Sequence, residues 1–294
     1  MTFRSGFVAL VGPPNVGKST LLNRILNEKL AIVSPKPQTT RNRIIGVYHG
    51  EGYQIAFIDT PGIHRTYTPL HKSMVASAQA VFKEVDVILA MVDVHRPDAP
   101  EISIILSNLR RSKVPALLVI NKIDRVEKTR LLPIIDDHRK RYPFAAIIPL
   151  SALTGDGVDR LLAQLQSMLN TSPALFPPDM KTDQSESFLV SEIIREKIYH
   201  RTSRELPYSS AVTVESIEED PARPMVSISA LIHVESESQK AILIGRGGRM
   251  IKSIGQAARG EIEKMTGSRV FLDLKVRVEK NWTNNPRALR RLGY

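Results

Sequence analysis

A short glycine-rich segment near the N-terminus constrains the fold of this 294-residue chain more than any other feature. It reads Gly12-Pro13-Pro14-Asn15-Val16-Gly17-Lys18-Ser19-Thr20 and contains the pattern G-x-x-x-x-G-K-[ST]. An apolar run, residues 6–11, precedes it, and an amphipathic stretch, residues 18–27, follows it. The order strand, loop, helix is the setting that this pattern requires, and it predicts the first unit of an α/β domain.

Further apolar runs extend that domain. They cover residues 54–59, 87–93, 116–121 and 146–150, and they show little of the alternation of a half-exposed strand. Such runs are typical of a parallel sheet with both faces covered. Residues 44–49 fit an antiparallel hairpin partner of 54–59, and helical stretches such as 99–111 and 158–169 lie between the runs. We expect a doubly wound, mostly parallel α/β domain over residues 1–170.

A second domain follows a stretch of helix breakers. Residues 171–185 are rich in Pro, Ser and Asp, and we interpret them as a linker. The pattern then changes to helix, strand, strand, helix, helix, strand, over residues 188–201, 210–217, 225–233, 239–244, 250–265 and 270–278. Residues 186–294 are therefore expected to form a small α+β domain.

Composition excludes several classes of protein. The chain has no Cys, so it has no disulfide, thiolate metal site or cysteine nucleophile. No stretch approaches 18 apolar residues, and the first apolar run is too short for a signal peptide, so neither a membrane span nor a secretion signal is expected. Residues 240–294 hold 13 basic and 4 acidic side chains, net +9. That excess fits either a polyanion-binding face or a solvated surface.

The glycine-rich segment carries the first chemistry. Glycines allow backbone N–H groups to turn around phosphate oxygens, and the helix N-terminus adds partial positive charge. Lys18 can reach the β- and γ-phosphates of a nucleotide, and Ser19 can ligate Mg²⁺. Asp59-Thr60-Pro61-Gly62 ends another apolar run. There Asp59 can hold Mg²⁺ through water, and the Gly62 N–H can face the γ-phosphate.

Two later segments point to the base. Asn121-Lys122-Ile123-Asp124 ends a predicted strand, and Asp124 can accept both donors of a guanine, N1–H and the exocyclic amine. In the same segment Asn121 can contact the N7 edge of the base, and Lys122 can pack over the ring. Ser151-Ala152-Leu153 follows the last predicted strand, and the Ala152 N–H can reach the guanine oxygen.

These motifs, in this order, resemble the translation-factor class of P-loop GTPases over residues 6–170. Between the first two, Pro37-Gln38-Thr39-Thr40-Arg41 resembles the switch I segment of the Era group. That resemblance implies hydrolysis of GTP to GDP and phosphate, with one Thr closing on Mg²⁺ and the γ-phosphate. Thr40 is favoured over Thr39 for this role.

One departure concerns the hydrolytic water. Ras-like enzymes place a Gln after D-x-x-G, whereas this chain has Ile63, which cannot orient water. We therefore expect slow unaided turnover. Era-like relatives share the apolar residue, and some use K⁺ as a charge at the reacting phosphates. Asn15 matches the position that ligates K⁺ in those relatives; the alternative is an Asn that only shapes the loop.

The C-terminal domain contains a second motif, in the segment Ile244-Gly245-Arg246-Gly247-Gly248-Arg249-Met250-Ile251. A G-x-x-G loop between two helices of an α-β-β-α-α-β domain resembles the type II KH fold, in which that loop clamps single-stranded nucleic acid. Arg246, Arg249 and Lys252 add charge beside the loop. Ile244, Met250, Ile251 and Ile254 either line a platform for bases or belong to the core.

Residues 188–294 as a whole resemble the C-terminal domain of the Era family. The resemblance implies binding to the 3′ end of 16S ribosomal RNA, a role in maturation of the small ribosomal subunit, a cytoplasmic location and peripheral contact with the inner membrane. No DNA partner is expected. Trp282, the single Trp, fits base stacking, an inter-domain contact or local packing.

Two other functions fit parts of the sequence. A small-molecule phosphotransferase would use the same phosphate loop, but Asn121–Asp124 and the absence of an obvious acceptor pocket argue against it. A passive RNA-binding protein with a vestigial GTPase domain would bind RNA in the same way in every nucleotide state.

Overall fold

A computed structural model describes residues 2–34, 36, 39–62, 68–219 and 224–294 of the chain. Contacts divide it into two compact units, one of residues 1–67 with 71–183 and one of residues 68–70 with 184–294. Among the described residues, no helix is both long enough and apolar enough to cross a membrane.

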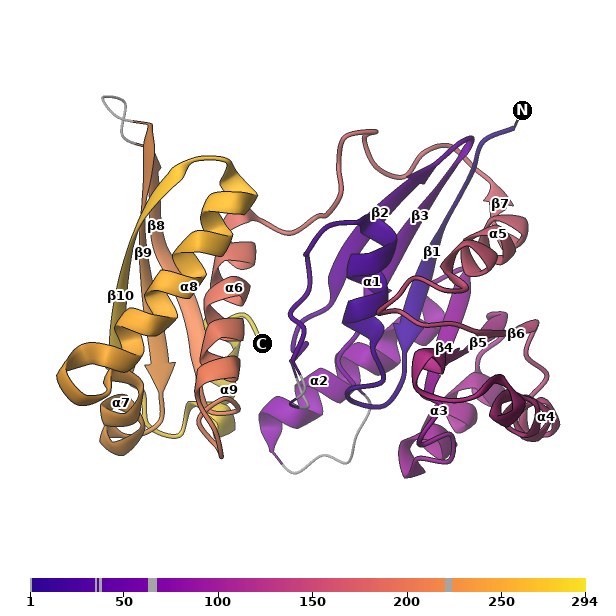
Figure 1. Cartoon of the computed structure of the whole chain (residues 1–294), viewed down its shortest axis with the longest axis horizontal. Coiled ribbons are helices and arrows are strands. Elements are labelled where there is room, and N and C mark those ends of the chain that lie inside the picture. The colour runs from indigo at the N-terminus through magenta and orange to yellow at the C-terminus, as the bar shows by residue number, and fades with distance from the viewer. Residues whose placement is uncertain (1, 35, 37–38, 63–67, 220–223) are drawn as a thin grey trace. The chain divides into compact units, whose positions relative to one another are not determined.

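The N-terminal unit is built on one sheet (Figure 1). In the described residues its strands follow the order β2-β3-β1-β4-β5-β6. The short strand β7 pairs with the first residues of β1, where β4 has not yet begun. Only β2 and β7 run antiparallel to their neighbours. The strands are β1 (Arg4–Val11), β2 (Ile44–Gly50), β3 (Tyr53–Asp59), β4 (Val87–Asp93), β5 (Ala116–Asn121), β6 (Ala146–Pro149) and β7 (Asn170–Thr171). The predicted doubly wound domain and its β2–β3 hairpin are confirmed.

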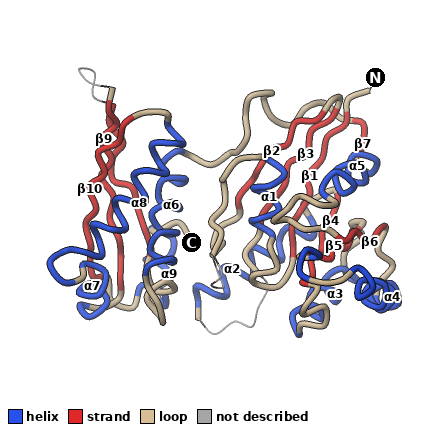
Figure 2. Tube along the Cα trace, viewed as in Figure 1, coloured by secondary structure: helices blue, strands red, loops and turns tan. Residues whose placement is uncertain are grey.

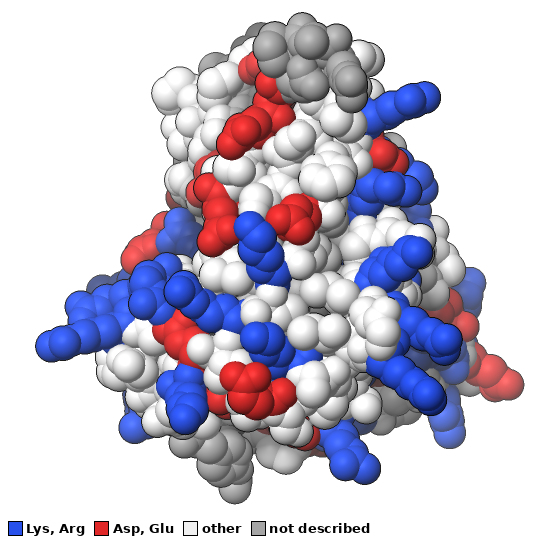
Figure 3. Space-filling view, turned by 90° about the vertical axis from the view of Figure 1, so that its left-hand side faces the viewer, with Lys and Arg blue, Asp and Glu red and all other residues white. Residues whose placement is uncertain are grey.

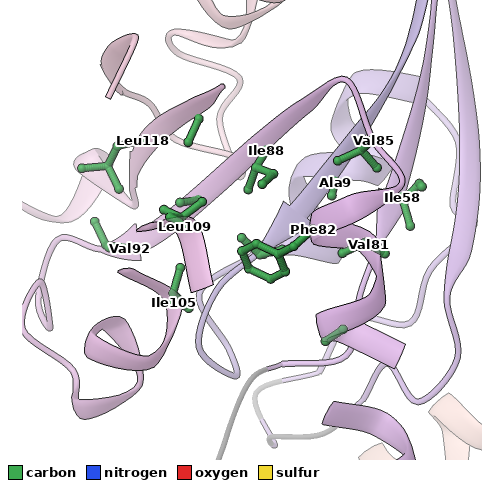
Figure 4. Close-up of a cluster of buried hydrophobic side chains, with 14 of the residues drawn as sticks. Ala9, Ile58, Val81, Phe82, Val85, Ile88, Val92, Ile105, Leu109 and Leu118 are labelled. Atoms are coloured by element: carbon green, nitrogen blue, oxygen red, sulfur yellow. The ribbon is translucent and has the colours of Figure 1, made fainter. Parts of the chain in front are cut away.

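Helices cover both faces of this sheet. They are α1 (Lys18–Leu26), α2 (Pro69–Ala80), α3 (Pro100–Arg111), α4 (Leu131–Arg141) and α5 (Val158–Met168), with short 3₁₀ turns at Val81–Lys83, Ile123–Arg125 and Lys128–Arg130. On one face, Ile88 and Val92 of β4 pack with Phe82, Ile105 and Leu109 (Figure 4). Strands β3 and β5 are buried along their whole length, which explains why their sequences do not alternate.

Much of the segment that we interpreted as a linker lies along the N-terminal unit. The Gln54 side chain accepts from the backbone N–H groups of Leu175 and Phe176 at 2.7 and 3.0 Å and donates to the Phe176 carbonyl at 2.9 Å. Farther along, Thr182 forms an antiparallel bridge with Gly46 of β2. Both ends of this stretch therefore pair with the sheet, Asn170–Thr171 with β1 and Lys181 and Thr182 with the edge strand β2.

The C-terminal unit is a three-stranded sheet with helices packed on it and a core of its own. The sheet order is β10-β9-β8, with β10 parallel and β8 antiparallel to β9. Helices α6 and α8 lie on one side of it (Figure 2). The elements are α6 (Glu186–Arg201), β8 (Ala211–Glu219), β9 (Met225–Val234), α7 (Glu237–Ile244), α8 (Arg249–Thr266), β10 (Arg269–Val278) and α9 (Pro286–Arg291), with 3₁₀ turns at Arg246–Gly248 and Trp282–Asn284.

Local signals account for the ends of several of these helices. The Ser185 side chain accepts from the Phe188 N–H and caps α6, and Asn285 caps α9 in the same way. A glycine in the left-handed region, Gly267, ends α8. The predicted α-β-β-α-α-β order is confirmed.

Candidate nucleotide pocket and nucleic-acid loop

The glycine-rich loop connects the carboxyl end of β1 to the N-terminus of α1. Gly17 has φ +103°, and a Cβ atom on it would lie 2.3 Å from the Asn121 amide nitrogen. Gly62, from the segment after β3, passes so close that its Cβ would lie 2.9 Å from the Pro14 backbone. Glycine is required at both positions, because the loop is packed against two other segments.

Lys18 and Asp59 form a buried charge pair at the start of α1. Lys18 Nζ donates to the carbonyl oxygens of Gly12 and Pro13, both at 3.1 Å. Burial lowers the pKa of Lys18 to about 8, against the opposing effect of Asp59. Burial likewise raises the pKa of Asp59, although Lys18 and hydrogen bonds from Ser19 and Thr40 oppose the shift. Both charges therefore stand to gain from a counter-charge in the site.

Three oxygen-bearing side chains predicted to bind Mg²⁺ meet at this point. Ser19 Oγ donates to Asp59 Oδ2 at 2.6 Å and lies 2.9 Å from Thr40 Oγ1, which donates to the same carboxylate oxygen at 3.2 Å. The other oxygen, Asp59 Oδ1, is buried and has no hydrogen-bond partner among the described residues. Hydroxyl and carboxylate oxygens are the ligands that Mg²⁺ prefers, so the residues present fit that ion.

A cavity of about 440 Å³ opens over these groups. Its lining includes Lys18, Ser19, Thr40 and Gly62 and also Lys122, from the segment after β5. The structure thus places the phosphate motifs and part of the base motif around one cavity. Asn15 also lines it, with an exposed side chain and φ +61°.

Asn121 joins three loops through a single buried amide. Its Nδ2 donates to the Val16 carbonyl at 2.8 Å, and its Oδ1 accepts from the N–H groups of Lys122 at 2.8 Å and Ala152 at 2.9 Å. Sequence reasoning assigned Asn121 to the base edge and did not foresee this connecting role. The Ala152 N–H points to Asn121 in this structure, so its contact with a guanine oxygen stays a prediction.

Lys122 reaches from the base motif to the phosphate loop. Its Nζ donates to the Asn15 carbonyl at 2.8 Å and forms an ion pair with Asp93 at 2.6 Å. Asp93 ends β4, and sequence reasoning did not single it out; its place at the carboxyl end of a buried strand was the available signal. Asp124 is about one-fifth exposed and lies 3.9 Å from Arg125.

Some predicted residues lie outside the described part of the chain. They are Ile63, which underlies the expectation of slow unaided turnover, and Pro37 and Gln38 of the segment that resembles switch I. Within that resemblance Thr39 and Thr40 are described, and both line the cavity; Thr40 is buried and Thr39 is half-buried.

The second predicted site is the loop between α7 and α8. Gly245, Gly247 and Gly248 all have φ between +61° and +74°, a conformation that favours glycine. Arg246, Arg249 and Lys252 are exposed beside the loop, and α8 begins at Arg249. Ile254 is fully buried in the core, whereas Ile244, Met250 and Ile251 are half-buried.

A groove of about 340 Å³ lies next to that loop, between α8 and β10. Its lining includes Lys252, Gln256 and Arg259 from the helix and Phe271 and Leu274 from the strand. Phe271 is 59% exposed, so an aromatic ring is available in a basic setting. Sequence reasoning missed Phe271, although the alternation along β10 places it on the face opposite the core residue Val270.

Charged side chains are unevenly distributed on the face of the molecule that Figure 3 shows. Asp and Glu gather in the upper middle of this view, and Lys and Arg project mainly from its right-hand edge and lower part. Trp282 is not available for stacking on a base, because it is fully buried. It donates to the Ser209 carbonyl at 2.9 Å and stacks on Tyr294, which supports the interpretation of local packing.

Together, a phosphate loop on a doubly wound sheet, a Mg²⁺-compatible oxygen cluster and a base motif tied to the same loop define a P-loop GTPase. Its second unit has the fold and glycine loop of a KH domain. Comparison with protein families agrees, because residues 7–122 match the model described as 50S ribosome-binding GTPase and residues 205–283 match the KH domain.

Full-length relatives identify the family. The chain is 51% identical to GTPase Era of Syntrophus aciditrophicus over 292 residues, which cover 99% of this chain and 95% of the relative. It is 53% identical to GTPase Era of Geotalea uraniireducens, with 99% and 98% covered. The chain therefore belongs to the Era family of GTPases, and its reaction is the hydrolysis of GTP to GDP and phosphate.

Solved structures of Era match along the whole chain. An Aquifex aeolicus Era variant bound to GDP and AlF₄⁻ superimposes with a TM-score of 0.96 at 40% identity, and 99% of each chain is covered. An Era complex with MgGDPNP and nucleotides 1506–1542 of 16S ribosomal RNA gives a TM-score of 0.97, also at 40% identity and 99% coverage of each chain.

Proposed function

We propose that this GTPase is a molecular switch that binds the 3′ end of 16S ribosomal RNA and assists assembly and maturation of the small (30S) ribosomal subunit. The observation that carries the proposal is the match, over nearly the whole chain, to Era bound to nucleotides 1506–1542 of that RNA. In this chain the RNA would lie against Gly245–Gly248 and in the groove between α8 and β10.

In the proposed nucleotide complex, the triphosphate lies in the loop from Gly12 to Thr20. Backbone N–H groups and the N-terminus of α1 face its oxygens, and Lys18 moves its ammonium from the Gly12 and Pro13 carbonyls to the β- and γ-phosphates. Guanine lies over Lys122 with its two donors on Asp124. The loop at Ser151–Leu153 lies at its oxygen edge.

Ser19, Thr40 and Asp59 are the residues that would hold Mg²⁺, with Asp59 acting through water. When bound, this ion neutralises charge on the β- and γ-phosphate oxygens. Thr40 is favoured over Thr39, because the Thr40 hydroxyl lies 2.9 Å from Ser19 Oγ and donates to Asp59 Oδ2 at 3.2 Å.

Hydrolysis joins a water oxygen to the γ-phosphorus and breaks its bond to the bridging oxygen. The products are GDP, inorganic phosphate and a proton. The Gly62 N–H donates to the γ-phosphate, so that this segment responds to its loss. We propose that Asn15, which is exposed in the cavity, helps to bind K⁺ near the bridging oxygen, where a cation offsets developing charge.

The proposed location is the cytoplasm, with peripheral contact of the protein with the inner face of the cell membrane. Both follow from the family resemblance. The partners are the 16S RNA and the small subunit.

The test is binding of full-length protein to a 3′ fragment of 16S RNA and to a 23S RNA fragment of equal length, at fixed ionic strength. Salt is held constant because phosphate contacts make affinity strongly salt-dependent. We expect the 16S fragment to bind at least tenfold more tightly. Preference for the 23S fragment would instead favour a large-subunit partner, as the name of the matching family model suggests.

A charge-matched pair of variants locates the contact. Arg249→Glu changes the first residue of α8, beside the glycine loop, and should weaken 16S binding about tenfold or more. Lys264→Glu makes the same charge change in the last turn of that helix, about 22 Å away, and should have little effect. Equal losses in the two variants would contradict a specific contact at the loop.

A further inference from the structure

Arg24 connects the phosphate-binding helix to the loop that follows β6. It lies in the last turn of α1, six residues after Lys18. Its Nε donates to the Ala152 carbonyl at 3.4 Å, and its Nη2 donates to the Leu153 carbonyl. A guanidinium holds its donors in a rigid planar fork, so one side chain that binds two successive carbonyls fixes the orientation of the loop.

The direction of these bonds determines where the loop presents its donors. The C=O and N–H of one peptide unit point in opposite directions. When Arg24 draws the Ala152 carbonyl toward α1, it turns the Leu153 N–H away from α1. From the other side, the Ala152 N–H donates to Asn121 Oδ1 at 2.9 Å. The loop is thus held by one residue at its carbonyls and by another at an N–H group.

Ser151 and Ala152 of this loop are buried, and among the described residues the hydrogen bonds that join the loop to α1 come from Arg24. Its internal bonds join Gly155 N to the Ser151 carbonyl at 2.8 Å and Thr154 N to Ser151 Oγ at 3.1 Å, and they only keep the turn compact. The Leu153 side chain is 61% exposed and adds little packing. Arg24 therefore supplies the attachment of this turn to the helix that carries Lys18.

We propose that Arg24 is a positioning residue for guanine recognition. It holds the Ala152–Leu153 peptide so that the Leu153 N–H stays at the oxygen edge of the base. This inference rests on the proposed placement of the guanine against Asp124 and the turn. A role limited to stabilising the end of α1 would affect all nucleotides alike, whereas positioning affects only the contact to the guanine oxygen.

The test measures dissociation constants of the full-length protein for GDP and 6-thio-GDP, in which sulfur, a weak acceptor, replaces the guanine oxygen. Wild type should prefer GDP. Arg24→Ala should weaken GDP binding about tenfold but 6-thio-GDP binding no more than about threefold, because the thio compound already lacks the contact. Arg24→Lys should lie between, since an ammonium lacks the planar fork.

Arg160→Ala is the matched control. Arg160 is an exposed arginine on α5 that donates to the Pro149 carbonyl at 3.5 Å, next to the turn but not in it, and both affinities should stay as in wild type. Equal losses for GDP and 6-thio-GDP in Arg24→Ala, or no loss for either, would overturn the inference. A separate variant tests the base placement. If guanine does not bind at Asp124, Asp124→Asn will leave the preference for GDP over xanthosine diphosphate unchanged.

Discussion

The side-chain amide of Asn121 donates to the carbonyl oxygen of Val16 at 2.8 Å, across 105 residues of sequence. The same side chain accepts from the Ala152 N–H, so the loops after β1, β5 and β6 are joined at one group that is only 2% exposed. A buried amide with this many partners is costly to remove. The phosphate loop and the base loops are therefore tied together at this side chain.

Substitution Asn121→Ala should loosen both ends of the nucleotide site. We expect GDP affinity to fall by a factor of 100 or more, and the nucleotide-free protein to lose about 2–4 kcal/mol of unfolding free energy, because the Val16 carbonyl and the Ala152 N–H lose their partner. Equilibrium binding and urea unfolding measure the two effects.

Asn108→Ala provides the control for that substitution. Asn108 lies on α3, and its side-chain nitrogen is buried without a hydrogen-bond partner among the described residues. Its removal should leave GDP affinity unchanged. If Asn121→Ala bound GDP as tightly as Asn108→Ala, the joining role of Asn121 would be wrong.

Nucleotide binding should take up a proton at alkaline pH. In the free protein, burial lowers the pKa of Lys18 to about 8, and neighbouring phosphate charge raises it in the complex. Between about pH 8 and 10 the free protein is mostly neutral at Lys18 while the complex is charged. GDP affinity should therefore weaken by up to tenfold for each pH unit above 8.

Calorimetry in buffers of different ionisation enthalpy measures this uptake directly. It should approach one proton at pH 9 and be small at pH 7. Lys18→Ala should bind GDP weakly, without the uptake. An uptake at pH 9 that persists in Lys18→Ala would assign the proton to another group.

The two threonines before β2 should differ in their effect on hydrolysis. Thr40 is buried and contacts both Ser19 and Asp59, whereas Thr39 is half-buried. We expect Thr40→Ala to slow single-turnover GTP hydrolysis 50-fold or more with little change in GDP affinity, and Thr39→Ala to slow it less than fivefold. If Thr39→Ala slowed hydrolysis more than Thr40→Ala, the role at Mg²⁺ and the γ-phosphate would belong to Thr39 instead of Thr40.

His138 should make the N-terminal unit sensitive to acid. It is fully buried on α4, and burial, together with nearby Arg141, lowers its pKa against the opposing effects of Asp137 and Asp98. Below about pH 6.5 the unfolded chain binds a proton that the folded state resists, so stability falls with pH down through the folded-state pKa. His138→Leu should reduce this loss between pH 7.5 and 5.5.

Two probes in that experiment report on the two units separately. Trp282, the only Trp, lies in the C-terminal unit, so its fluorescence reports unfolding there and should be unaffected by His138→Leu. Retention of GDP reports the N-terminal unit. An unchanged pH dependence of GDP retention in the variant would contradict the role given to His138.

The sequence predicted most of the fold because each domain carries a strong local signal. The unbroken apolar runs at Val87–Asp93 and Ala116–Asn121 could hardly be anything but central strands, and the structure gives them these same bounds. The hairpin of β2 and β3 was visible from its neighbouring apolar runs.

The connections between loops were not predictable in this way. Composition marks residues 171–185 as loop, but it does not show that the Gln54 amide holds Leu175 and Phe176. Arg24 looks like an ordinary basic residue at a helix end. Its contacts with Ala152 and Leu153 depend on where the loop after β6 lies relative to α1, which only the folded chain shows.

In the proposed switch, nucleotide state and RNA binding are coupled in one protein. The most direct measurement is the affinity of full-length protein for the 3′ fragment of 16S RNA with GDP and with a non-hydrolysable GTP analogue, in KCl at one ionic strength. We expect at least tenfold tighter RNA binding with the analogue and, by reciprocity, tighter binding of the analogue when RNA is present. Equal RNA affinity in both states would contradict coupling within the isolated protein and describe a passive RNA-binding protein instead.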